Sequence, residues 1–115
     1  MRGATTCDEN TKADIDAKTQ RLVAEMLERN AITHDDLVSI IFTATDDITA
    51  EFPATAARAL GLGDVPLLCA RELAIGHGTA RTIRVMMHFY GEQHRGDLHH
   101  VYLEGARALR DDLPA

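Results

Sequence analysis

The sequence predicts an α+β domain, α/β-like in its chain order, with a mainly five-stranded mixed sheet and two helices on one face. Three observations lead to this prediction. One long stretch, residues 12–29, carries apolar side chains at helical spacing. Several short runs rich in Val, Ile, Leu and Phe have the composition of strands. These segments follow one another roughly in the order β-α-β-α-β-β-β, which allows both helices to cover the same face of one sheet.

The first half of the chain is predicted to contain a strand, a helix and a second strand. Residues 2–7 form a strand that is weak by composition. Residues 8–11 supply caps and an acidic first turn for the helix, and Asn30 is a suitable stop. After a single turn at residues 33–36 comes the most β-rich run, residues 37–45. Because nearly all of its positions are apolar, we expect a central strand covered on both faces.

The second half is predicted to contain one more helix and three strands. Pro53 suits the first position of the helix, and Gly61 can end it because glycine accepts the left-handed cap conformation. The strand at residues 65–70 contains Pro66, which argues for a strand start or a sheet edge. The remaining predicted segments are strands at 82–90 and 100–104, a weak extension of the last strand at 106–109, and a polar tail at 110–115.

Length and composition indicate one soluble domain, residues 1–115, and exclude several classes of partner. Eighteen acidic residues outweigh twelve Lys and Arg, and no basic tract is present, so we expect no nucleic acid. No secretory signal and no apolar run of roughly 20 residues is seen, so we expect no membrane and a cytoplasmic location. Cys7 and Cys69 lie far apart without metal-ligand spacing, which indicates free thiols in a reducing cytosol and no metal.

One permanent cation, Arg84, stands in the middle of the predicted strand at residues 82–90. Strand alternation places Ile83 and Val85 on an apolar face, and Arg84 with Met86 on a mixed one. A guanidinium stays protonated and carries five donors, so it needs either water at a strand edge or an anion in a pocket. An exposed edge arginine is the simpler interpretation of this residue alone, and an anion site is the alternative.

Other polar residues lie at or just beyond the ends of predicted strands and could share a site with Arg84. Arginine grips a carboxylate through two parallel hydrogen bonds, so several arginines in one cleft would suit a small dianion. Spacing alone does not establish that they converge. In a domain this small, a cleft shared between subunits is a reasonable expectation. These residues are Arg2, Arg58, Glu72, Tyr102 and Arg110.

Competing catalytic arrangements are poorly supported. Ser39 is the only serine and lies in an apolar strand without the flanking glycines of a nucleophile elbow. The histidines, including His99 and His100, lack a recognisable metal-ligand spacing. Cys69 at the end of an apolar strand is typical of a buried thiol, and the glycines at residues 76 and 78 do not form a phosphate loop.

The order and spacing of several stretches together resemble the small, trimeric α/β-barrel chorismate mutases, over nearly the whole chain. The stretches are Arg-Gly-Ala-Thr-Thr at 2–6, Phe-Thr-Ala-Thr-Asp-Asp at 42–47, Phe-Pro-Ala-Thr-Ala-Ala-Arg at 52–58, Val-Pro-Leu-Leu-Cys-Ala-Arg-Glu at 65–72, Ile-Arg-Val-Met at 83–86, and His-Val-Tyr-Leu-Glu at 100–104 with Leu-Arg at 109–110. The resemblance implies a trimeric pseudo-α/β barrel that rearranges chorismate to prephenate for aromatic amino acid biosynthesis. It implies no cofactor, no metal and clefts formed between two neighbouring subunits.

The resemblance also implies a role for each matching residue. Arg84 would face the ether oxygen that gains negative charge as the C–O bond breaks, and Arg2 would hold a carboxylate. Glu72 would accept the ring hydroxyl with support from Cys69, and Tyr102 would donate near the side-chain carboxylate. The remaining contributions are apolar walls from Phe52 and Leu109 and a positive field at the mouth from Arg58 and Arg110.

Two alternatives to this enzyme remain open. The first is a trimeric barrel that binds a small carboxylate without catalysing its rearrangement; the short segment before Arg2 favours it. The second is an imine-hydrolysing trimer of similar architecture, whose sequence pattern is not found here. Thr55 replaces a lysine that some relatives carry at the cleft rim, for which we expect a modest effect on affinity.

Overall fold

The computed structural model describes residues 1–76 and 78–110, except for the side chain of Arg110. Its strands are β1 (Arg2–Thr6), β2 (Leu37–Ala44), β3 (Leu67–Arg71), β4 (Thr82–Phe89) and β5 (Val101–Tyr102). Its helices are α1 (Lys12–Arg29), α2 (Pro53–Ala57) with a wider π-helical continuation η2 (Arg58–Leu62), and the 3₁₀ helices η1 (His34–Asp36), η3 (Arg95–Asp97) and η4 (Glu104–Arg110). The predicted α+β class with a five-stranded mixed sheet is confirmed.

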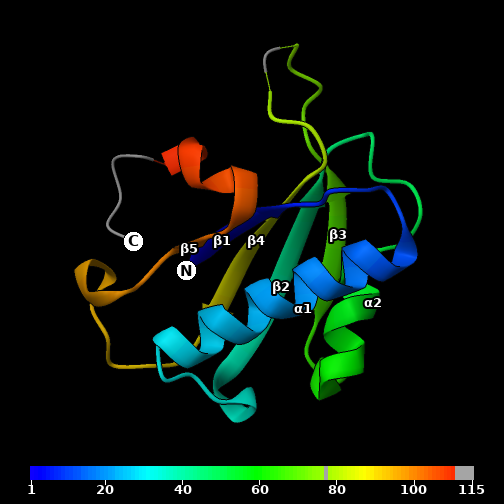
Figure 1. Cartoon of the computed structure of the whole chain (residues 1–115). Helices are drawn as coiled ribbons and strands as arrows, with labels where there is room; N and C mark the ends of the chain where they lie inside the picture. The colour runs from blue at the N-terminus through cyan, green and yellow to red at the C-terminus, as the bar shows by residue number, and fades with distance from the viewer. Residues whose placement is uncertain (77, 111–115) are drawn as a thin grey trace.

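The strands form one sheet in the order β3-β2-β4-β1-β5, so β4 lies at its centre (Figure 1). β4 runs antiparallel to both β1 and β2, whereas β1 with β5 and β2 with β3 are parallel pairs. Pro66 predicted a strand start or a sheet edge; β3 begins directly after it at Leu67 and also lies at one edge of the sheet. The interpretation of Arg84 as an edge arginine is wrong, because its strand is hydrogen-bonded on both sides.

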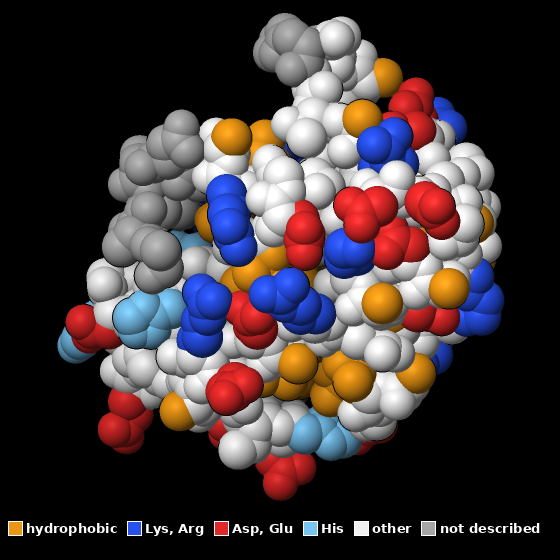
Figure 2. Space-filling view, viewed as in Figure 1, with side chains coloured by type: hydrophobic (Ala, Val, Ile, Leu, Met, Phe, Trp, Pro, Cys, Tyr) orange, Lys and Arg blue, Asp and Glu red, His pale blue; other side chains and the backbone are white. Residues whose placement is uncertain are grey.

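Both helices lie on one face of the sheet, as the sequence predicted (Figure 1). Leu22, Val23 and Met26 of α1 are fully buried against β-strand residues that include Phe42 and Met87. Burying each such side chain stabilises the fold by roughly 1.5–3 kcal/mol, so the apolar stripe of α1 fixes this helix on the sheet. The outer surface of the helix layer interleaves basic and acidic side chains (Figure 2), which is typical of a solvated surface.

The ends of the helices follow the chemistry that the sequence indicated. The Thr11 side chain caps α1 by accepting a hydrogen bond from the backbone N–H of Asp14, and Asn30 is the C-terminal cap. Pro53 begins α2, and Gly61, with a φ of 87°, interrupts the helical conformation one residue before η2 ends. That φ lies in the left-handed region where a side chain is strained, which explains the glycine at this position.

Among the residues that the structure describes, no α-helix covers the second face of the sheet. Residues of β2 alternate between buried and partly exposed, so the prediction of a strand covered on both faces is wrong for the single chain. On this face the short helix η4 packs beside β1, where the Gly105 backbone N–H donates to the Thr6 hydroxyl. Met86 on β4 is 39% exposed and Leu68 on β3 is 60% exposed. We call the surface of β2, β3 and β4 opposite the helices the open face.

The end of the chain differs from the prediction in one further respect. β5 has only two residues, and the following segment is the 3₁₀ helix η4 instead of a weak extension of the strand. The tail at residues 111–115 lies outside the described residues.

Both cysteines are free thiols, and burial as the largest cause raises the pKa of Cys7 to about 11. None of the helices among the described residues is long and apolar enough to cross a membrane.

Candidate active site

Arg84 stands at the middle of the central strand and projects from the open face. The register places Ala4 of β1 on one side of it and Thr43 of β2 on the other. Its side chain is 46% exposed, and its Nε lies 2.5 Å from Oε1 of Glu72 in an ion pair. This pairing holds the guanidinium by one nitrogen. The two terminal nitrogens make no hydrogen bond within the described part of the chain, so they are the donors left for a ligand.

Glu72 is placed by the end of β3. Its backbone N–H donates to the carbonyl of Ala44 at 3.0 Å, which prolongs the pairing of β3 with β2 by one residue. Its carboxylate is 16% exposed and forms the ion pair with Arg84 through Oε1. The same Oε1 accepts a hydrogen bond from the hydroxyl of Thr43 at 3.0 Å. One oxygen of the carboxylate is therefore held by two side chains from two neighbouring strands. Sequence reasoning did not single out Thr43, because threonine is common in strands.

A hollow of about 220 Å³ brings three of the predicted site residues together. Arg2, Arg84 and Tyr102 line it, with Thr43. The sheet explains this convergence: β1 lies between β4 and β5, Arg2 pairs with Met86, and Tyr102 pairs with the same Ala4 that faces Arg84. Residues directly opposite in neighbouring strands project to the same face. Two arginines and a phenol therefore surround one depression on the same face.

A second hollow of about 240 Å³ adjoins Arg84 on the side of the loops that follow β2 and β3. It is lined by Glu72 and Arg84 and by the acidic residues Asp46 and Asp47. Burial raises the pKa of Asp47, but hydrogen bonds from the Thr45 hydroxyl and the backbone N–H groups outweigh it, so that the pKa lies below its usual value. The carboxylate is thereby kept charged, and this side of Arg84 is unsuited to an anion.

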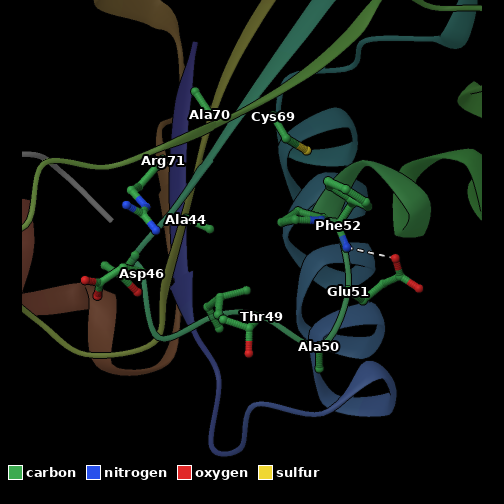
Figure 3. Close-up of a pocket in the computed structure, with 12 residues that line it drawn as sticks. Ala44, Asp46, Thr49, Ala50, Glu51, Phe52, Cys69, Ala70 and Arg71 are labelled. Atoms are coloured by element: carbon green, nitrogen blue, oxygen red, sulfur yellow. Dashed lines mark hydrogen bonds between the residues drawn. The ribbon is translucent and has the colours of Figure 1, made fainter.

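A third hollow, of about 380 Å³, is lined by Phe52 and Cys69 (Figure 3). The thiol of Cys69 points toward the ring of Phe52, which is 67% exposed (Figure 3). Cys69 pairs with Phe42 and packs against the core under the helices, so its side chain lies on the helix face of the sheet. The carboxylate of Glu72 reaches Arg84 on the open face. Within one chain, Cys69 and Glu72 therefore point away from each other.

The last three predicted residues stand apart from these hollows. Arg58 is exposed at the start of η2, and Leu109 is partly buried in η4; neither lines any of the three. The side chain of Arg110 lies outside the described residues. One chain thus unites Arg2, Glu72, Arg84 and Tyr102. It leaves Phe52, Cys69 and Arg58 elsewhere.

The chemistry of the assembled group is that of binding and electrostatic stabilisation. Within the described residues no cluster of three or more His, Cys, Asp or Glu is arranged to hold a metal ion. The hollow beside Arg84 offers two guanidinium groups and a phenol, which suit carboxylates and a developing oxyanion. The fold and this group define a small α+β protein with an arginine-centred site for a carboxylate-bearing molecule.

Comparison with known proteins identifies the family to which the chain belongs. The family model for type I chorismate mutases matches residues 1–113, and the chain belongs to that family. It is 42% identical over 114 residues to the chorismate mutase AroH of Thermus thermophilus, covering 98% of this chain and 93% of that protein. It is 39% identical over 114 residues to AroH of Bacillus subtilis, covering 98% and 90%. The family predicted from the sequence is confirmed.

A solved structure gives the same answer for the fold. A chorismate mutase from Clostridium thermocellum superposes with a TM-score of 0.92 at 45% sequence identity, covering 94% of this chain and 96% of that one. The match extends over nearly the full length of both proteins. The sheet that carries Arg84 is therefore the sheet of a chorismate mutase.

Proposed function

We propose that the chain catalyses the Claisen rearrangement of chorismate to prephenate in aromatic amino acid biosynthesis, in the cytoplasm. The observation that carries this proposal is the arginine at the centre of the sheet, held by Glu72 through Nε at 2.5 Å and open toward a hollow that Arg2 and Tyr102 also line. Membership of the type I family supplies the reaction. The geometry supplies a reason why this chain can perform it.

The reaction is unimolecular and needs no proton transfer or covalent intermediate. A catalyst must hold a flexible dianion in a compact, reactive conformation and must meet the charge that separates as the C–O bond breaks. In our assignment the terminal nitrogens of Arg84 meet the ether oxygen, and Arg2 binds a substrate carboxylate. Tyr102 donates to the side-chain carboxylate, and Glu72 accepts the ring hydroxyl. Charge stabilisation by a group already in place requires no reorganisation during the reaction.

We also propose that each site is completed by a neighbouring copy in a homotrimer. Two observations support this. The open face leaves apolar side chains such as Leu68 and Met86 without cover in the single chain. In addition, Phe52, Cys69 and Arg58 lie away from Arg84 within one chain. A neighbour's Phe52 and Arg58 would supply an apolar wall and positive charge, with Leu109 and Arg110 closing the mouth.

Turnover is tested first with the purified chain and the Arg84→Ala variant. Saturable loss of the diene absorbance of chorismate, with prephenate as the product, is expected for the parent and not for the variant. Saturable binding of chorismate without turnover would instead favour the non-catalytic, carboxylate-binding barrel. Sedimentation gives the subunit number, which is expected to be three.

Mixed trimers test whether sites lie between subunits. Arg84→Ala and Arg58→Ala variants are each expected to be impaired, in different halves of the site. In a trimer with cyclic symmetry, every mixed trimer keeps one interface with both halves intact, so random exchange should restore about a quarter of the parental activity. A mixture that stays as inactive as its components, although exchange is confirmed by mass, would place the whole site within one chain.

A further inference from the structure

We infer that Thr43 is a positioning residue for the proposed reaction, acting through Glu72 on Arg84. The inference rests on the proposed function and adds a residue to it. Its basis is that the Thr43 hydroxyl and the Arg84 Nε both bind the same oxygen, Oε1 of Glu72, at 3.0 and 2.5 Å. Thr43 lies on β2, Arg84 on β4 and Glu72 directly after β3, and the register places Thr43 directly opposite Arg84.

The two oxygens of the Glu72 carboxylate have different surroundings. Oε1 accepts a hydrogen bond from the Thr43 hydroxyl and forms the ion pair with Arg84 Nε. Oε2 forms no hydrogen bond with the described residues, so it is the oxygen available to a ligand hydroxyl. A carboxylate held by one donor can rotate about its last bond and exchange its oxygens. A second donor on the same oxygen, from a different strand, resists that rotation.

The same contacts bear on the guanidinium. Because Nε and the terminal nitrogens of arginine are coplanar, a carboxylate fixed beside Nε restricts the positions that the terminal N–H groups can take. Thr43 lines the hollow with Arg84 and Tyr102, and its side chain is partly exposed. A fixed hydroxyl on β2 thus orients the cation on β4 through the carboxylate that follows β3.

Replacement of Thr43 by Val removes the hydroxyl and keeps the branched shape, whereas replacement by Ser keeps the hydroxyl. We expect kcat/KM to fall about tenfold in Thr43→Val, as for loss of one hydrogen bond to a charged group, and mainly through kcat. The charge that Arg84 meets develops only in the transition state, so poor alignment lowers kcat more than it raises KM. Thr43→Ser should stay within about twofold of the parent, given the retained hydroxyl.

A matched control and a double variant separate positioning from general structure. Ser39 lies on the same strand and projects to the same face, with its hydroxyl 3.2 Å from His88 Nδ1, so Ser39→Ala should leave kcat unchanged. If Thr43 acts through Glu72, adding Thr43→Val to Glu72→Ala should have no further effect on kcat. Full additivity of the two changes, or a parental kcat in Thr43→Val, would overturn the inference.

A readout that does not need turnover distinguishes this inference from the proposed function. The Nε–H of Arg84 should give a nitrogen-15 resonance that exchanges slowly with water, assigned by its loss in Arg84→Lys. We expect that exchange to accelerate severalfold in Thr43→Val and not in Thr43→Ser, because a carboxylate fixed beside Nε shields the proton from water. An unchanged exchange rate in Thr43→Val refutes the positioning role. An inactive parent with the expected exchange pattern would refute only the reaction.

Discussion

Replacing Arg84 by Lys separates the shape of the cation from its charge. The parental guanidinium forms an ion pair with Glu72 through Nε at 2.5 Å, and in the proposed assignment its terminal nitrogens bind the substrate. Lysine has a single nitrogen, which must serve both partners. Because Glu72 is fixed in the free protein by Thr43 and is only 16% exposed, the ammonium is drawn to the carboxylate and away from the ether oxygen. The charge is kept, but it is no longer aimed at the reacting atoms.

The magnitude follows from what is lost. Removal of one preorganised donor to a developing oxyanion costs about 2.7–4 kcal/mol, which is a factor of roughly 100 to 1,000 in kcat. We therefore expect Arg84→Lys to lose more than roughly a hundredfold in kcat, and a neutral isostere such as citrulline to lose at least as much. The loss should be measured in a continuous chorismate assay at saturating substrate.

The control is the same substitution at an ion-paired arginine away from the site. Arg29 near the end of α1 contacts Glu25 at 2.7 Å on the surface, and such exposed pairs contribute little. Arg29→Lys should keep parental kcat and KM. An Arg84→Lys variant within tenfold of the parent, in a folded protein of unchanged subunit number, would refute the role of the planar guanidinium.

Three further predictions concern stability and are measured as melting temperatures at matched protein concentration. In Gly3→Ala the new Cβ would lie 2.5 Å from the sulfur of Met26. Because such overpacking costs about 1–3 kcal/mol, Tm should fall by roughly 4–12 °C. An unchanged Tm would mean that the Met26 side chain moves aside without cost. The buried side-chain amide of Asn30 accepts from the His99 backbone N–H at 2.7 Å and donates to the His99 carbonyl at 2.9 Å. Leaving these backbone groups unpaired costs about 2 kcal/mol, so Asn30→Ala should lower Tm by roughly 8 °C. A fall in Tm below roughly 2 °C would contradict this. The pKa of Asp47 is lower in the folded chain than its usual value of 3.8. Its carboxylate therefore stabilises the fold above pH 3.8, and this contribution is lost as the pH falls through the lower folded pKa. Below pH 3.8 the Tm of the parent should fall more steeply than that of Asp47→Asn, and parallel curves of Tm against pH would exclude the contribution.

Local sequence signals predicted the helices well and the neighbours of the strands poorly. The apolar spacing of α1 and Pro53 at the start of α2 are local features with the predicted role, and Gly61 breaks the helical conformation within η2. The place of β4 between β1 and β2 depends on pairing between distant segments, which composition does not encode. For that reason the run with Arg84 could be read as an edge strand, although it is the centre of the sheet.

The candidate site was predictable only in part, and mostly through the resemblance. Spacing alone could not establish that Arg2, Glu72, Arg84 and Tyr102 converge, because their convergence depends on the strand order. Thr43 escaped notice because a threonine in an apolar strand is ordinary. The signal that identifies it is its register opposite Arg84, which exists only once β2 and β4 are paired.

The position of Arg84 on a central strand explains how a small domain can support a reaction that depends on placement alone. A strand paired on both sides holds its backbone more firmly than a loop does, and a site on such a strand inherits that rigidity. The chain carries a net charge of -6, so the local positive field comes from a few arginines held in place. Glu72 neutralises part of the charge of Arg84 through the ion pair at Nε but restrains the position of the guanidinium. The ion pair therefore weakens the positive field around Arg84 but orients its guanidinium. In the proposed reaction such orientation favours a transition state whose charge develops at one atom.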